Sequence, residues 1–189
     1  MLMLLVLAIL LDFLIHLKST IVLQGFFTND EYNLFPAKQM IDDYENYLDL
    51  TGNRKVIFED SLFLDLGSSK DYVTASASKI VAYTSAKELD FLVTTEPLML
   101  HYLEGFALED LRNLTRGDLI PCLYFGKDGN HKYEAVAIDM TTSRFIQGRK
   151  LKEKYYLLVP ENSKRKEAVR EFLSYAFPIS GTSQSPRDR

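Results

Sequence analysis

Apolar residues along this chain occur in two patterns, continuous runs and helical spacings, which alternate from one segment to the next. Runs of β-branched and aromatic residues bounded by polar turn residues predict strands, whereas apolar positions three and four apart predict helices. Strands are expected at Ser19–Phe27, Lys55–Glu59, Leu89–Thr94, Leu119–Phe125, Lys132–Ile138 and Tyr155–Val159. Helices are expected at Phe35–Leu48, from Ser69 or Asp71 to Ala86, from Thr95-Glu96-Pro97 through Leu103, and after Asn162 up to Phe177.

Strands that alternate with helices in this way indicate an α/β fold. The nearly continuous apolar run Leu89–Thr94 is typical of a buried parallel strand, and Asp128-Gly129 predicts a hairpin between the fourth and fifth strands. We therefore expect one domain over residues 19–178, built as a mainly parallel three-layer α/β sheet with an antiparallel hairpin. Residues 179–189 are polar and Ser-rich, which predicts a disordered tail.

The first 17 residues, MLMLLVLAILLDFLIHL, are apolar except for Asp12 and His16. A helix of this length is just long enough to span a bilayer, so we expect a transmembrane anchor over residues 1–18. A cleaved signal peptide is the first alternative, but the run has neither a basic lead nor a small-x-small site. A soluble core or interface helix is the second. The missing basic lead removes the usual orientation cue and is consistent with a true start further upstream.

Composition narrows the function classes. Hydrophobic residues make up 47% and charged residues 25% of the chain, as in globular proteins. The net charge of −4 argues against nucleic-acid binding. Between Arg144 and Arg170 nine Lys or Arg outnumber three Glu, which we interpret as a solvated face rather than a phosphate or lipid patch. Cys122 is the only cysteine, so an intramolecular disulfide and a thiolate metal site are excluded.

Several phrases together resemble a known family, although each of them is short. They are Leu89-Asp90-Phe91-Leu92-Val93, the segment Tyr102–Leu111, the hairpin with Asp128-Gly129 and Tyr133, and Leu157-Leu158-Val159-Pro160 followed by a helix. In this order they resemble the extracellular solute-binding proteins of the type II periplasmic-binding fold. The layout is most similar to small membrane-anchored proteins of Gram-positive bacteria that carry a reduced version of this fold outside the cell.

The resemblance implies a domain that lies outside the cytoplasm and binds a solute or a partner. Full members of the family insert a second lobe after the hairpin, and their ligand lies between the lobes. Here only Met140–Lys154 separates the hairpin from the last strand, which is too short for a lobe. A single-lobe domain is therefore expected. The closure of two lobes on a ligand, which the resemblance would otherwise imply, is not expected for this chain.

In a doubly wound sheet, ligands bind at the carboxyl ends of the strands. This rule selects Thr28 and Asn29 after the first strand, Thr95 and Glu96 after the third, and Asp139 at the end of the hairpin as candidate ligand-binding residues. The alternative is that these residues only cap helices and form turns.

Catalytic and cofactor motifs are missing from the sequence. It has no Gly-x-Ser-x-Gly, no Cys-His arrangement and no glycine-rich phosphate loop, and its scattered His residues lack metal-ligand spacing. We expect no cofactor and no metal. The favoured function is a membrane-anchored, extracytoplasmic module, without catalysis, for a protein partner or a small polar ligand. The alternatives are a hydrolase or transferase with its site at the strand ends, and a structural subunit of a membrane complex.

Overall fold

The structure of the protein, a computed structural model, describes residues 19–179. The strands are β1 (Thr20–Thr28), β2 (Arg54–Leu62), β3 (Phe91–Thr95), β4 (Leu123–Lys127), β5 (Tyr133–Asp139) and β6 (Tyr155–Leu158). The α-helices are α2 (Ala37–Tyr47), α3 (Asp71–Ser85), α4 (Glu96–Gly105) and α5 (Lys166–Ala176), and short 3₁₀ helices lie at η1 (Leu111–Asn113), η2 (Gly117–Cys122) and η3 (Met140–Thr142).

Each expected strand and helix has a counterpart, and the fourth strand differs most. The sequence predicts a strand from Leu119, but the chain forms η2 first and β4 begins only at Leu123. Pro121 lies inside η2. Because proline has no backbone N–H to donate to a neighbouring strand, this segment is better suited to the tight turn than to the sheet.

Two sequence predictions concern the ends of the chain. The anchor over residues 1–18 lies outside the described residues, as does the disordered tail over residues 179–189 apart from Ile179. Within residues 19–179, none of the helices has both the length and the apolar character needed to cross a bilayer.

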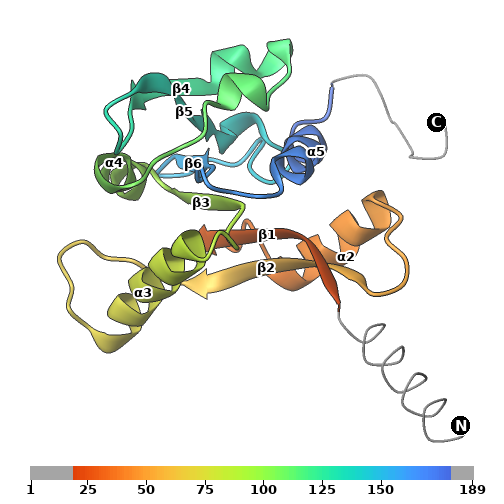
Figure 1. The fold of residues 1–189 in the computed structure, drawn as a ribbon, viewed down its shortest axis with the longest axis horizontal. Coiled ribbons are helices and arrows are strands. Elements are labelled where there is room, and N and C mark those ends of the chain that lie inside the picture. The colour runs from red at the N-terminus through yellow and green to blue at the C-terminus, as the bar shows by residue number, and fades with distance from the viewer. Residues whose placement is uncertain (1–18, 180–189) are drawn as a thin grey trace, which may run out of the picture.

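The six described strands form one sheet in the order β2-β1-β3-β6-β5-β4 (Figure 1). β1 runs parallel to β2 and to β3. The pairings of β3 with β6, of β6 with β5 and of β5 with β4 are antiparallel. The predicted α/β class is confirmed, but the prediction of a mainly parallel sheet is wrong, since the sheet is mixed.

The direction of β6 follows from its connection to β5. Asp139, the last residue of β5, pairs with Tyr156 near the start of β6. The connecting segment therefore turns back at the same edge of the sheet. A parallel neighbour would need a crossover along the whole strand length, usually through a helix. The loop after η3 contains no such helix, so β6 returns antiparallel.

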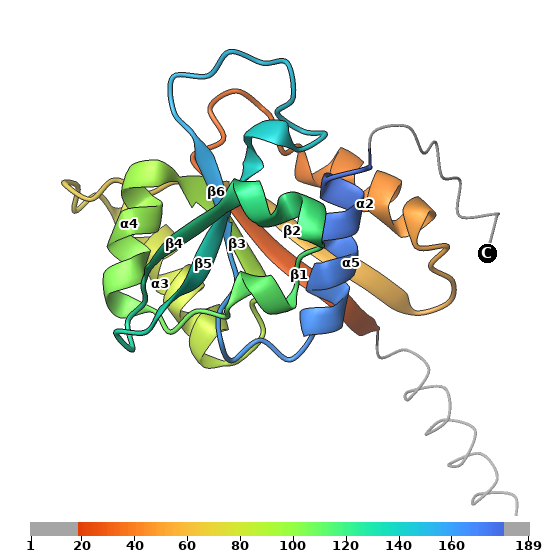
Figure 2. The ribbon, with the colours of Figure 1, turned by 90° about the horizontal axis from the view of Figure 1, so that it is seen from above.

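Helices cover both faces of the sheet. Figure 2 shows the strands running between α3 and α4 on one side and α2 and α5 on the other. Neighbouring residues of a strand point to opposite faces, so Phe27 packs with the α2 and α5 layer and Phe26 with the α3 and α4 layer. These two buried clusters form the core of a three-layer arrangement.

The core under α5 requires a glycine in the central strand. Phe91 of β3 is fully buried and stacks on Phe172 of α5 with ring centroids 4.5 Å apart. Gly25 of β1 is paired with Phe91. A Cβ atom at Gly25 would lie 2.0 Å from Cζ of that ring, so only glycine allows the ring to lie across β1.

A buried carboxylate ties the start of α5 to the sheet. Asp90, just before β3, accepts hydrogen bonds from the backbone N–H of Gln24 (2.7 Å), from Oγ of Ser163 (2.9 Å) and from Nε of Arg165 (2.6 Å). Arg165 also donates to the carbonyl of Glu88. Burial raises the pKa of the Asp90 carboxyl, while Arg165 and the other donors act in the opposite direction. These bonds fix where α5 begins.

Candidate functional site

The carboxyl ends of β1 and β3 lie at one edge of the sheet, as the sequence predicts, but Thr28 is not available to a ligand there. Its side chain is fully buried. Its hydroxyl makes a hydrogen bond of 2.8 Å with that of Thr94 on the neighbouring strand. Thr28 therefore joins two strands inside the sheet, a role that neither the ligand-binding prediction nor the alternative of helix caps and turns describes.

Asn29 has a structural role at the same edge. Its backbone is in the left-handed region, with φ of 55°, which asparagine tolerates better than most residues. Its side-chain amide donates to the carbonyl of Leu64 and accepts from the N–H of Leu64, each at 2.8 Å. The Tyr155 hydroxyl donates to the carbonyl of Asn29 at 2.8 Å. Asn29 thus connects the ends of β1 and β2 with the start of β6.

Two of the five predicted residues line one small cavity. Asn29 and Thr95 share a hollow of about 170 Å³ with Glu31, Tyr32, Lys152, Glu153 and Tyr155. Burial, followed by the charges of nearby carboxylates, raises the pKa of the Tyr155 hydroxyl well above its usual value. This hydroxyl therefore stays protonated and serves as a hydrogen-bond donor.

Glu96 and Asp139 do not line this cavity; they lie beside the start of β6. Glu96 is 3.5 Å from the Tyr156 hydroxyl. Asp139 accepts hydrogen bonds from the N–H of Thr141 at 2.8 Å and from Nζ of Lys154 at 3.0 Å. Burial alone would raise the pKa of Asp139, but the hydroxyl of Thr141, which also donates to this carboxylate, together with these two donors outweighs burial and lowers the pKa. Asp139 therefore caps η3 as a turn-forming residue.

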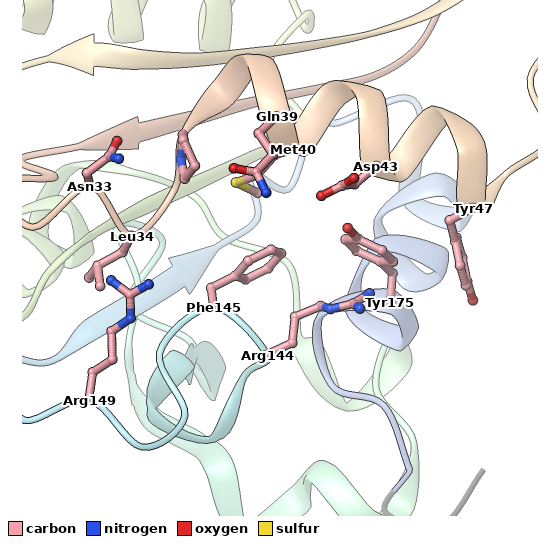
Figure 3. A pocket seen from close by; sticks show the side chains of 11 residues that line it. Asn33, Leu34, Gln39, Met40, Asp43, Tyr47, Arg144, Phe145, Arg149 and Tyr175 are labelled. Atoms are coloured by element: carbon pink, nitrogen blue, oxygen red, sulfur yellow. The ribbon is translucent and has the colours of Figure 1, made fainter. Parts of the chain in front are cut away.

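A larger cavity of about 610 Å³ lies between α2, the end of α5 and the loop after η3. We call it the α2–α5 groove (Figure 3). The sequence analysis did not identify it. Its lining residues are Asn33, Leu34, Pro36, Gln39, Met40, Asp43, Tyr47, Arg144, Phe145, Arg149 and Tyr175.

Two arginines from the loop after η3 supply the positive charge of the groove. The guanidinium of Arg144 lies over the ring of Tyr175, 4.3 Å from its centroid, and its backbone N–H donates to the carbonyl of Ala176. Arg149 follows Gly148, whose φ of 80° turns the chain. Asp43 of α2 is the one carboxylate in the lining. Within residues 19–179, neither arginine forms an ion pair with a carboxylate.

Aromatic side chains form one end of the groove. The rings of Tyr47 and Tyr175 lie with centroids 5.0 Å apart, and both contact Tyr44 behind them. The Tyr44 hydroxyl is buried and has no hydrogen-bond partner among residues 19–179. Burial and neighbouring groups raise its pKa far above the usual value, so it stays neutral. The groove therefore combines cationic side chains with flat apolar surfaces.

A second groove, of about 470 Å³, lies between α3 and α4. Apolar side chains dominate its lining, including Leu64, Leu98, Tyr102 and Phe106. Leu66 and Val81 at its rim are 59% and 51% exposed. We call it the α3–α4 groove. Its surface is suited to apolar contacts, although Asp65, His101 and Glu104 also line it.

In the part of the chain from residue 19 to 179, no cluster of three or more His, Cys, Asp or Glu side chains could hold a metal ion. Cys122 lies 3.6 Å from the Thr142 hydroxyl.

Comparison with known proteins leaves the site to be interpreted from its geometry. No protein-family model, no curated protein and no solved structure matches this chain.

Proposed function

We propose that the protein is a membrane-anchored, extracytoplasmic binding module, a single-lobe relative of the type II solute-binding proteins that does not catalyse a reaction. Residues 1–17 would hold it in the membrane, and the α/β domain would bind a ligand in the α2–α5 groove. The observation that carries the proposal is this groove, because a cavity of about 610 Å³ with two arginines that lack carboxylate partners is suited to holding a small molecule.

The order of elements supports the proposed relationship. The phrases that carry the resemblance fall on β3, the end of α4, the β4–β5 hairpin and β6 followed by α5. The connection from β5 to β6 is a loop with a single short 3₁₀ helix, where a two-lobed protein would insert its second lobe. A single-lobe protein must take its ligand on its own surface, and the α2–α5 groove provides such a surface.

Protease accessibility tests the proposed location. Intact cells would be treated with a protease and compared with cells whose membranes have been opened, and the domain would be detected by an antibody. Digestion in intact cells is expected. Protection until the membrane is opened would place the domain inside the cell and contradict the extracytoplasmic assignment.

A ligand screen tests the binding function. The full chain in detergent micelles would be titrated with small molecules of positive, negative and zero charge, with thermal unfolding as the signal. A ligand that binds only the native state raises the unfolding temperature as its concentration rises. The proposal predicts such a rise for at least one class of ligand, and unchanged unfolding with every class would refute it.

The α3–α4 groove favours a second candidate function, that of a structural subunit in a membrane complex. Leu66 and Val81 expose apolar surface of the kind that marks protein contacts. The expected result of replacing both by aspartate is a smaller complex on native gels of membrane extracts, with thermal unfolding unchanged. Replacing the exposed Leu100 by aspartate is the matched control.

A further inference from the structure

We infer that the α2–α5 groove takes an organic anion, in which a carboxylate or phosphate is attached to a flat apolar group, that Arg149 binds the anionic end, and that Arg144 contacts the ligand beyond Phe145. The inference rests on the proposed binding function and adds the chemical class of the ligand.

The two arginines of the groove lack carboxylate partners within residues 19–179. Elsewhere in the described chain, Arg112, Arg116, Arg165 and Arg170 each form an ion pair with a carboxylate, whereas Arg54 forms none within residues 19–179. The two arginines of the groove form none. A guanidinium stays charged at every physiological pH and offers five N–H donors in a planar fork, which matches the two oxygens of a carboxylate or phosphate. The groove therefore presents donors that residues 19–179 leave unused.

Arg144 is held in place before any ligand binds. Its guanidinium lies over the ring of Tyr175, and its backbone is hydrogen-bonded to the end of α5. Stacking engages the face of the guanidinium and leaves its N–H edge directed away from the ring. An arginine that is ordered before the ligand arrives loses less conformational freedom on binding.

The space between the two arginines is lined by apolar side chains. In Figure 3 the ring of Phe145 stands between the side chains of Arg149 and Arg144, and Met40 of α2 faces it from the opposite wall. A flat apolar group can pack against these side chains while its anionic end reaches a guanidinium. The cavity volume of about 610 Å³ lies within the range usual for small-molecule sites.

Asp43 determines which way the ligand lies in the groove. It lies on α2 at the end of the groove that holds Tyr175, away from Arg149 (Figure 3). A negative group at that end would be repelled by its carboxylate. The anionic end of the ligand is therefore expected at Arg149, and Arg144, whose guanidinium lies over Tyr175, contacts the ligand at the opposite end.

The experiment compares three probes that share one ring. Phenylacetate, phenyl phosphate and the neutral phenylacetamide would be titrated calorimetrically into the full chain in detergent micelles, up to millimolar concentrations. The variants are R149Q, which removes the proposed anion contact, and K150Q, which removes the same charge one residue later from a side chain outside the lining. Circular dichroism would check that both variants fold.

The expected result is that at least one anion binds and phenylacetamide does not. R149Q should weaken binding of the anion about tenfold or more, the usual effect of losing a charge-assisted hydrogen bond, whereas K150Q should change it by less than about twofold. Binding of phenylacetate alone would identify carboxylates as the ligand class, and binding of phenyl phosphate alone would identify phosphates.

The failures are distinguishable. Three outcomes would each overturn the inference: equal binding of phenylacetamide and phenylacetate, equal weakening by R149Q and K150Q, or no binding of either anion. In each case the proposed binding function still stands if another compound in the ligand screen binds. If no compound of any charge binds, the proposed function itself fails.

Discussion

Replacing Gly25 by alanine is the sharpest test of how the core under α5 is packed. The new Cβ would lie 2.0 Å from Cζ and 2.5 Å from each Cε atom of Phe91. Carbon atoms in contact are normally about 3.5 to 4.0 Å apart, so the ring would have to move by about 1.5 Å. It cannot move freely, because its opposite face is stacked on Phe172.

The magnitude follows from this geometry. Overpacking a core typically destabilises a protein by about 1–3 kcal/mol. The destabilisation by Gly25→Ala should reach or exceed the upper end of this range, about 3 kcal/mol, because the Phe91 ring is packed between a strand and a helix. For a domain of this size, each kcal/mol lowers the melting temperature by about 2–4 °C. Gly25→Ala should therefore melt about 6–12 °C below the original protein.

Circular dichroism during urea and thermal unfolding is the appropriate assay, because the chain contains no tryptophan to report by fluorescence. Gly105→Ala is the matched control, since a Cβ at that position would meet no atom within 4 Å. It should leave stability unchanged or raise it slightly, because alanine is favoured over glycine in a helix.

A double-mutant cycle supplies the refutation. Phe91→Leu removes the clashing ring atoms, so it should recover part of the loss in the Gly25→Ala background although it is destabilising on its own. The coupling free energy should be at least about 1 kcal/mol. If the two substitutions are additive, or if Gly25→Ala alone costs less than about 1 kcal/mol, the argument from the close approach is wrong.

Three further predictions concern hydrogen bonds and charge, and unfolding in urea measures each of them. Tyr44→Phe should leave the free energy of unfolding unchanged or raise it, because the Tyr44 hydroxyl is buried without a partner among the described residues. Tyr155→Phe should lower the free energy of unfolding by about 1 kcal/mol, because it removes the hydrogen bond to the carbonyl of Asn29. Equal effects of the two substitutions would contradict this. Asn29→Ala should lower the free energy of unfolding by about 2 kcal/mol more than Asn33→Ala. Both positions have positive φ, but the side chain of Asn29 also forms hydrogen bonds with the main chain of Leu64. Similar losses of stability would show that backbone strain dominates. The lowered pKa of Asp139 means that its stabilising contribution is present above the unfolded pKa, near 4, and is lost as the pH falls through the folded value. Asp139→Asn should therefore reduce the difference in urea midpoint between pH 7 and pH 3, and an unchanged difference would refute the assignment.

The elements of the fold could be predicted because their signals are local. The run of β-branched and aromatic residues in β1, the helical spacing in α2 and the turn residues of the β4–β5 hairpin each lie within a short window of sequence. The direction of β6 could not be predicted in the same way. All four of its residues are buried, so its pattern is equally compatible with a parallel or an antiparallel neighbour.

The candidate site was predicted only in part, for a similar reason. Asn29 and Thr95 were found because both follow strands that end at one edge of the sheet, a rule that depends on topology alone. The rule does not say whether a side chain is already used, and Thr28 is. The α2–α5 groove combines Asp43 with Tyr175, which are far apart in sequence. The basic residues after Arg144 were the one local signal, and they were interpreted as a solvated face.

The position of β6 in the middle of the sheet has a consequence for synthesis of the chain. β6 is the last strand to be made, yet it alone joins β3 to the β4–β5 hairpin within the described sheet. Until Tyr155–Leu158 emerge from the ribosome, β3 keeps an open edge and the hairpin has no partner strand. Nascent chains that end before β6 should therefore be open to proteolysis and to pairing with other chains, and protection should arise only when nearly the whole domain has been made.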